Sequence, residues 1–418
     1  MQKMNKNIKK IYRYTIKPIL NVITLRFLRR RITHCFICLI TYLKNKKLIQ
    51  SIENNLPPAT VLIFQHRFFD ENGEKCFNGG AERYIKDLSD ILHELHFNPV
   101  LVQVGGENIW YKQLNNLLVI GLPNKRGLNC YSKQIALFKK YKFAIYSGAY
   151  KFSKVLLHPN ILISHGITWD APKSAKCSYK LFENVNNFVS VDTNTISWLR
   201  TTFINEFSNK RVVYIPNYVD TTVYMGESKL IDKDKSQKKR IKIIFPRRAS
   251  AERGYWLMSS VLPSILEKYK NVDFDFIGFA HENEIVKDIE KLVQMFSGRV
   301  NHHVVEPDEM PKFYQQADIS IIPTLYSEGT SLSCLEAQAC GNVVIATNIG
   351  GLPNLIIDGY NGILINPNPQ ELMDALDRVL SDIEFREYLS KNAINVAKSF
   401  DKQIWNSRWK KIFKEITN

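Results

Sequence analysis

Two glutamates, Glu328 and Glu336, stand eight positions apart around a run of small residues. The run 329–331 reads Gly-Thr-Ser and leads into an apolar segment, which predicts a tight loop that opens a helix carrying Glu336. A helix N-terminus offers free backbone N–H groups and the positive end of the helix dipole, and both favour phosphate. Two carboxylates beside such a site can accept hydrogen bonds from sugar hydroxyls. Two surface acids at this spacing are common. However, a glycine pair, Gly350-Gly351, follows the next apolar run and favours a binding site.

Two cations stand in the segment 245–256 (FPRRASAERGYW), at Arg248 and Arg253, with Arg247 as a spare candidate. At a strand-to-helix loop, a pair of cations can neutralise the charge that develops on a departing diphosphate. Surface arginines in a loop are the alternative. His165 follows the apolar run ILIS, and a neutral imidazole there can hydrogen-bond a sugar hydroxyl, although an isolated histidine is more often structural.

Apolar runs of strand length alternate with helical patterns through most of the chain, which predicts two doubly wound α/β domains. In such sheets ligands sit at the carboxyl ends of the strands. The strands of the first series are expected at 59–65, 98–103, 116–120, 142–146, 161–164, 187–191 and 212–215, with a helix at 81–95. Those of the second series are expected at 241–245, 273–277, 300–305, 318–323, 342–346 and 362–365, with helices at 254–269, 282–296, 333–340 and 370–397.

The domain boundaries follow from composition. We expect a basic amphipathic extension over 1–55 and a first domain over 56–225, joined through a polar, charged linker over 226–240 to a second domain over 241–399. A final helical segment, 400–418, carries large apolar side chains and needs a partner surface, which we expect on the first domain.

From about residue 60 to 400 these motifs resemble glycosyltransferase family 4 (glycosyl transferases group 1), retaining enzymes of GT-B fold, in which two Rossmann-like domains face each other across a cleft. The resemblance implies that Glu328 approaches the hydroxyls of the donor sugar and that Glu336 binds the ribose. It also implies that the backbone N–H groups that follow Gly329, those of Thr330, Ser331 and Leu332, reach the phosphates and the sugar.

Other positions match the family in the same order along the chain. Arg248 and Arg253 have the spacing of the family's Arg and Lys that clamp the donor diphosphate, with Arg253 in the place of the lysine. Gly79-Gly80 resembles the glycine-rich loop before the first helix, and His165 the histidine beside the transferred sugar. Gly278 resembles the strand-end glycine near the nucleotide base.

The implied function is transfer of a sugar, with retention, from a nucleoside-diphosphate sugar to a glycan or lipid-linked acceptor. The Lys-, Asn- and Ile-rich composition suggests an AT-rich bacterial genome and cell-surface polysaccharide synthesis. No metal or other cofactor is expected, because such enzymes use basic residues and helix dipoles, and the Asp273/Asp275 pair lies within a predicted strand. The alternatives are another GT-B enzyme, a nucleotide-sugar epimerase or phosphorylase, or a non-catalytic nucleotide-sugar or glycan-binding protein.

The formal charge of +17 is concentrated at one end of the chain. Residues 1–52 hold 13 Lys/Arg and no acid, so the remaining chain carries 44 basic against 40 acidic residues, only +4. This distribution argues against nucleic acid and predicts that residues 1–50 lie on an anionic membrane, placing the protein in the cytoplasm at the inner face of the cell membrane. The apolar run 32–43 is too short to span a bilayer. A solvated helix packed on the domain is the alternative, and the seven scattered cysteines favour a reducing compartment.

Overall fold

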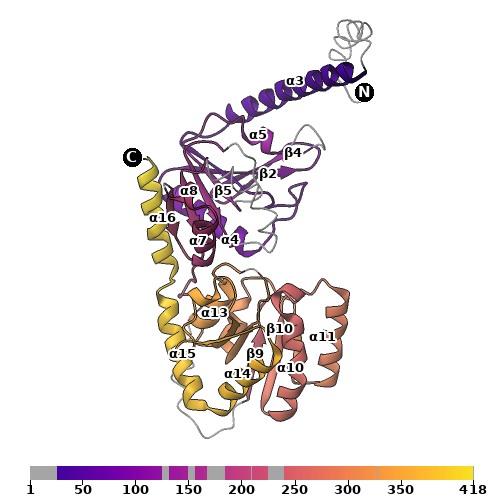
Figure 1. Ribbon diagram of the computed structural model, residues 1–418, viewed down its shortest axis with the longest axis vertical. Helices are drawn as coiled ribbons and strands as arrows, with labels where there is room; N and C mark the ends of the chain where they lie inside the picture. Colours follow the sequence, from indigo (N-terminus) through magenta and orange to yellow (C-terminus); the bar gives the residue numbers. More distant parts are fainter. Residues whose placement is uncertain are drawn as a thin grey trace.

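The structure is a computed structural model that describes residues 26–124, 131–148, 156–166, 184–208, 210–224, 240–326 and 328–417. It contains two α/β domains, one beyond the other along the long axis of the molecule, with α3 (Arg26–Glu53) extending from the far end of the first (Figure 1). Most of the expected linker 226–240 falls outside the described residues.

The first domain is built on an eight-stranded sheet with the order β3-β4-β2-β1-β5-β6-β7-β8. All neighbouring strands are parallel except β3, which pairs antiparallel with β4. The buried strands are continuous apolar runs, as expected where helices cover both faces. Their bounds are β1 Thr60–Phe64, β2 Asn98–Gly105, β3 Trp110–Leu114, β4 Leu117–Pro123, β5 Ala144–Ser147, β6 Asn160–Ser164, β7 Asn187–Ser190 and β8 Arg211–Tyr214; the helices are α4 Gly80–Glu94, α5 Tyr131–Ile135, α7 Thr193–Thr202 and α8 Ile204–Phe207.

The second domain is a six-stranded parallel sheet with the order β11-β10-β9-β12-β13-β14, which is the Rossmann order. The chain order reverses between β9 and β12, so the crevice of this sheet opens at the carboxyl ends of these two strands. The strands are β9 Ile241–Phe245, β10 Val272–Ile277, β11 Val300–His303, β12 Ile319–Ile322, β13 Val343–Thr347 and β14 Ile363–Ile365. The helices are η3 Ala251–Arg253, α10 Tyr255–Lys268, α11 Asn283–Met295, α12 Met310–Gln316, α13 Leu332–Ala339, η4 Leu352–Asn354, α14 Pro369–Ser381 and α15 Ile383–Lys398.

The last helix, α16 (Lys402–Thr417), returns to the first domain and runs along its side (Figure 1). The crossing is fixed where the N–H of Val219 donates to Phe400 and the N–H of Lys402 donates back to Val219, both at 3.0 Å. Trp405, Trp409, Ile412 and Phe413 join the core beneath α4 and β1. One helix therefore ties the end of the chain to the domain in which the described chain begins.

The predicted fold class is confirmed, and two local predictions need correction. Strand β3 was not expected, because its central residues are exposed and carry no apolar run. The single helix predicted over 370–397 is two helices, since Asp382 turns the chain and accepts a hydrogen bond from the N–H of Phe385 as the N-cap of α15. The N-terminal basic segment is helical from Arg26, and its last turns pack on the domain through Ile49 and Ile52.

The rest of α3 projects away from the body (Figure 1). Apolar and polar residues are only weakly segregated around the whole helix, but Leu39, Tyr42 and Leu43 form a local exposed apolar cluster at helical spacing. Within the described ranges, no helix combines the length and apolar character that a membrane crossing needs. The five cysteines in these ranges are free thiols.

Candidate functional site

Arginine and glutamate side chains meet at the point where the second sheet reverses its strand order. Arg247 follows β9 and Glu328 follows β12, and these two strands are paired neighbours. A guanidinium nitrogen of Arg247 lies 2.7 Å from Oε2 of Glu328, and one of Arg253 lies 2.6 Å from the same oxygen. Thr324 donates its hydroxyl to Oε2 of Glu328 as well, at 3.1 Å. The topology therefore places two cations and a carboxylate where ligands bind in open α/β sheets.

Glycines let the chain approach closely enough to build this cluster. Gly254, directly after Arg253, has φ of 80°, and a Cβ there would lie 1.7 Å from the carbonyl oxygen of Pro323. Gly278 at the end of β10 has φ of 135°, and a Cβ there would lie 2.8 Å from the carbonyl carbon of Arg247. Larger residues at either position would push the arginine segment off the sheet end.

The carboxylate of Glu328 is held in its ionised form. Burial raises the pKa of Glu328, but the nearby Arg247 and Arg253 outweigh burial and bring that pKa below its ordinary value. Burial in turn lowers the pKa of Arg247. The Arg247 side chain is only 8% exposed, whereas the Arg253 side chain is 28% exposed. Arg253 is therefore the cation of this cluster more accessible to a ligand.

The loop after Glu328 opens helix α13, as predicted. Ser331 occupies the N-cap position of α13 but makes no capping hydrogen bond. Its hydroxyl is buried and finds no hydrogen-bond partner among the described residues. Because the first N–H groups of a helix need partners from outside it, this helix start can receive an anionic ligand.

Glycines on both sides enclose this loop. A Cβ on Gly329 would lie 2.6 Å from the carbonyl oxygen of His165 in the first domain. A Cβ on Gly350 would lie 2.2 Å from the carbonyl oxygen of Glu328, and the N–H of Gly351 donates to that oxygen at 2.8 Å. The loop from Glu328 to Thr330 is thus packed between the two domains.

The predicted residues of the first domain lie against the same helix start. A Cβ on Gly80 would lie 2.8 Å from Cδ1 of Leu332, so the Gly79-Gly80 loop contacts the first residue of α13. The Nε2 atom of His165 lies 2.9 Å from Oγ of Ser147, and Tyr84 packs edge-on against the imidazole. The structure therefore brings both predicted first-domain elements to the predicted loop of the second domain.

Glu336 lies within α13 and is buried. A guanidinium nitrogen of Arg83, in the first turn of α4, lies 2.6 Å from its Oε1 atom. This ion pair joins the two domains. The sequence analysis did not select Arg83, although it lies only three positions after the Gly79-Gly80 pair.

Arg248 lies elsewhere. Its side chain is half exposed and lies 3.8 Å from Glu252, four residues further on. The structure thus places Arg247, the spare candidate, beside Arg253 and Glu328 in the position expected of Arg248. Thr324, which also contacts this cluster, was missed; its only signal is its place just after a predicted strand.

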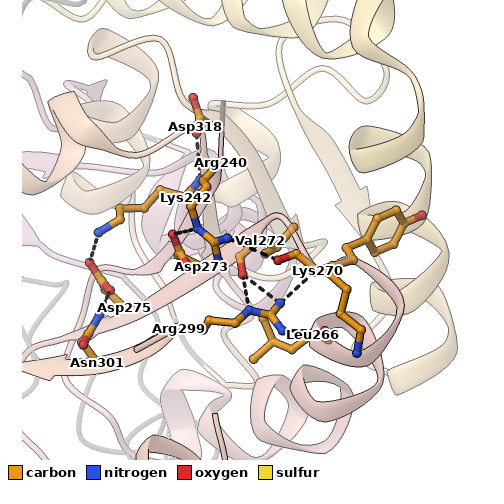
Figure 2. Close-up of polar contacts among 11 residues, drawn as sticks. Arg240, Lys242, Leu266, Lys270, Val272, Asp273, Asp275, Arg299, Asn301 and Asp318 are labelled. Atoms are coloured by element: carbon orange, nitrogen blue, oxygen red, sulfur yellow. Dashed lines mark hydrogen bonds and ion pairs between the residues drawn. The ribbon is translucent and has the colours of Figure 1, made fainter. Parts of the chain in front are cut away.

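The two aspartates lie within strand β10, as predicted, and each is paired with a protein cation (Figure 2). Arg240 donates to both carboxylate oxygens of Asp273, at 2.6 and 2.7 Å. Asp275 accepts from Lys242 and Asn301, each at 2.9 Å. Among the described residues, no group of three His, Cys, Asp or Glu side chains is arranged to hold a metal ion.

Known proteins resemble this chain in sequence and in fold. Residues 227–396 match the family described as glycosyl transferases group 1. An uncharacterized glycosyltransferase of Methanocaldococcus jannaschii is 32% identical over 182 residues, 42% of this chain and 43% of that protein. The chain spans less than half the length of the first curated relatives it matches.

Solved structures match over most of the chain. Sucrose-phosphate synthase from Thermosynechococcus elongatus is 15% identical with a TM-score of 0.66, covering 85% of this chain and 98% of its own. Anabaena HepE in complex with UDP-glucose is 18% identical with a TM-score of 0.62, covering 85% and 99%. At these identities the likeness establishes the fold. Residues 227–396 therefore match glycosyl transferases group 1, and the chain has the two-domain GT-B fold.

Proposed function

We propose that this protein is a retaining glycosyltransferase that moves a sugar, of hexose type, from a nucleoside-diphosphate sugar to a glycan or lipid-linked acceptor. The observation that carries the proposal is the Arg247–Glu328–Arg253 cluster directly before the uncapped N-terminus of α13. Two cations and a helix start suit a diphosphate, and an ionised carboxylate suits sugar hydroxyls. The relative of similar fold that was solved with UDP-glucose supports this class of donor.

In the proposed reaction the bond between the sugar's anomeric carbon and the diphosphate breaks, and the diphosphate keeps the electron pair. The acceptor hydroxyl attacks from the same face and gives its proton to the departing diphosphate, so the glycosidic bond forms with retained configuration. Arg253 and Arg247 stabilise the charge on the departing diphosphate, together with the N–H groups of Ser331 and Leu332. Glu328 orients the sugar and His165 lies on its far side. We expect the reaction to need no metal, because these groups supply the positive charge.

The acceptor and the setting belong to the same proposal. We expect the acceptor to reach the cleft along the first domain, near Gly79-Gly80 and His165. Residues 1–50 would hold the enzyme at the inner face of a bacterial membrane, where lipid-linked acceptors of surface polysaccharides are found. The lysines Lys44, Lys46 and Lys47 on the projecting α3, next to its exposed apolar cluster, support a bilayer as its partner.

The test is to incubate the full-length protein with UDP-, GDP- and ADP-sugars and candidate glycan acceptors, and to follow nucleotide release and the anomeric configuration of the product by NMR. We expect nucleotide release from one donor class and activity in excess EDTA. The anomeric bond should keep its configuration, axial in donor and product or equatorial in both. Glu328→Gln should lower turnover at least about 100-fold. Turnover that needs orthophosphate, epimerisation without an acceptor, or nucleotide binding without turnover would each contradict the proposal.

A further inference from the structure

Arg83 and Glu336 form an ion pair between residues that stand 253 positions apart. Arg83 lies on the first turn of α4 in the first domain, and Glu336 on α13 in the second. The pair uses Oε1 of the glutamate at 2.6 Å, and the Glu336 side chain is only 7% exposed. The contact therefore exists only while the two domains face each other as in this structure.

The other described residues beside Glu336 include two tyrosines. The residues packed around α13 on this side include Tyr224 and Tyr314, whose rings lie 5.9 Å apart within an apolar cluster. Burial and the neighbouring charge of Glu336 raise the pKa of Tyr224, so its hydroxyl stays neutral. Within the described part of the chain, Arg83 is the one Lys or Arg that pairs with Glu336. Removing the charged partner of a buried carboxylate is strongly destabilising.

We propose that Arg83 is a positioning residue for nucleotide recognition: it holds the buried carboxylate of Glu336 in the orientation in which it can accept hydrogen bonds from the ribose hydroxyls. This inference rests on the proposed function, since it assumes that a nucleoside diphosphate binds at α13. It adds that recognition of the ribose depends on the first domain. A buried acceptor already fixed by one charged partner loses little freedom when it binds a hydroxyl, and this favours affinity.

The experiment measures calorimetric binding of a nucleoside diphosphate and of its 2′,3′-dideoxy analogue, using UDP, GDP or ADP, whichever binds the wild-type protein tightest. The wild-type protein should bind the ribonucleotide about tenfold more tightly than the dideoxy analogue. Arg83→Met should lower affinity for the ribonucleotide by roughly the same factor and leave the dideoxy analogue within about twofold. Arg83→Lys should recover part of the loss, and adding Glu336→Gln to Arg83→Met should cause little further loss.

The matched control is Arg211→Met. Arg211 lies at the start of β8, away from α13, and pairs there with Glu415 of α16. It should leave the affinity for both ligands unchanged. If Arg83→Met lowers the affinity for both ligands equally, Arg83 contacts the phosphates instead. If Arg83→Met raises the affinity, the ion pair competes with the ligand. Either result overturns the inference. If Arg83→Met does not fold, the same comparison is made with Arg83→Lys, which weakens the ion pair. An affinity ratio of ribonucleotide to dideoxy analogue equal to that of the wild type would then also overturn the inference. Failure of the wild-type protein to bind any of the three nucleotides would instead overturn the proposed function.

Discussion

Asn217 and Thr330 join the two domains beside the candidate site. The N–H of Asn217 donates to Oγ1 of Thr330 at 2.7 Å, and the Asn217 side-chain amide donates to the Thr330 carbonyl oxygen at 2.5 Å. The Thr330 hydroxyl also donates to the carbonyl oxygen of Val191 in the first domain, at 2.8 Å. The Thr330 side chain is therefore committed to the interdomain contact and leaves ligand binding to the backbone around it.

Thr330→Val should destabilise the protein by about 1–3 kcal/mol, because it leaves the N–H of Asn217 and the carbonyl of Val191 buried without their partner. Thr330→Ser keeps the hydroxyl and is the matched control, expected to lose under about 1 kcal/mol. Denaturant unfolding of the two variants measures the difference. Equal stabilities would mean that the hydroxyl contributes nothing to the interdomain contact.

The structure also ranks the three arginines near the sheet end. Arg247→Met and Arg253→Met should each lower donor-dependent turnover about 100-fold, since both side chains contact Glu328 at the proposed diphosphate site. Arg248→Met should lower it less than either, because its side chain points to Glu252 and solvent. Steady-state kinetics on the true donor gives the order. A larger loss for Arg248 than for Arg247 would show that the bound state uses a different pair.

Much of the fold was predictable because buried parallel strands are apolar runs that stand out in the sequence, and glycine-bounded loops mark their ends. The sequence could not predict which of the adjacent Arg247 and Arg248 turns toward Glu328. The answer depends on the path of the backbone after β9, where it packs against Gly278. Arg83 was beyond reach for a different reason. Its partner lies in the other domain, and no local pattern encodes how the two domains face each other.

The contact of α16 with the first domain predicts a stability effect. Trp409 is fully buried, stacks on Phe413 and donates its indole N–H to the hydroxyl of Tyr84 at 3.1 Å. Trp409→Ala should cost about 3–5 kcal/mol of unfolding free energy, as expected for a large buried aromatic residue. Ile404→Ala, an exposed position on the same helix, should cost under about 1 kcal/mol. Similar losses at the two positions would contradict the packing of α16.

The projecting part of α3 offers a way to test the proposed membrane binding without removing residues buried on the domain. Deletion of residues 1–43 removes the exposed cluster of Leu39, Tyr42 and Leu43 but keeps Ile49 and Ile52, which are buried on the first domain. The truncated protein should lose co-sedimentation with vesicles containing anionic lipid and keep its nucleotide affinity.

Substituting Glu for Leu39, Tyr42 and Leu43 together should weaken vesicle binding at least about tenfold, because it removes apolar area and adds repulsion from anionic lipid. Neutral phosphatidylcholine vesicles are the control and should bind the wild-type protein poorly. If the deletion leaves vesicle binding unchanged, α3 is not the membrane-binding element.

The two arginines beside Glu328 predict the pH range in which this carboxylate stabilises the protein. The folded pKa of Glu328 lies below its ordinary value of 4.5, so its stabilisation is fully present above that value and disappears as the pH falls through the lower, folded pKa. Glu328→Gln should therefore cost about 3–5 kcal/mol by urea unfolding, by a constant amount between about pH 8 and 5.5. Below pH 4.5 the gap to wild type should narrow, because the wild-type carboxyl also becomes neutral. Glu415→Gln, at an exposed ion pair with Arg211, should cost under about 1 kcal/mol throughout. A gap for Glu328→Gln that instead begins to close near pH 7 would mean that burial, not the two arginines, sets the ionisation of this carboxyl.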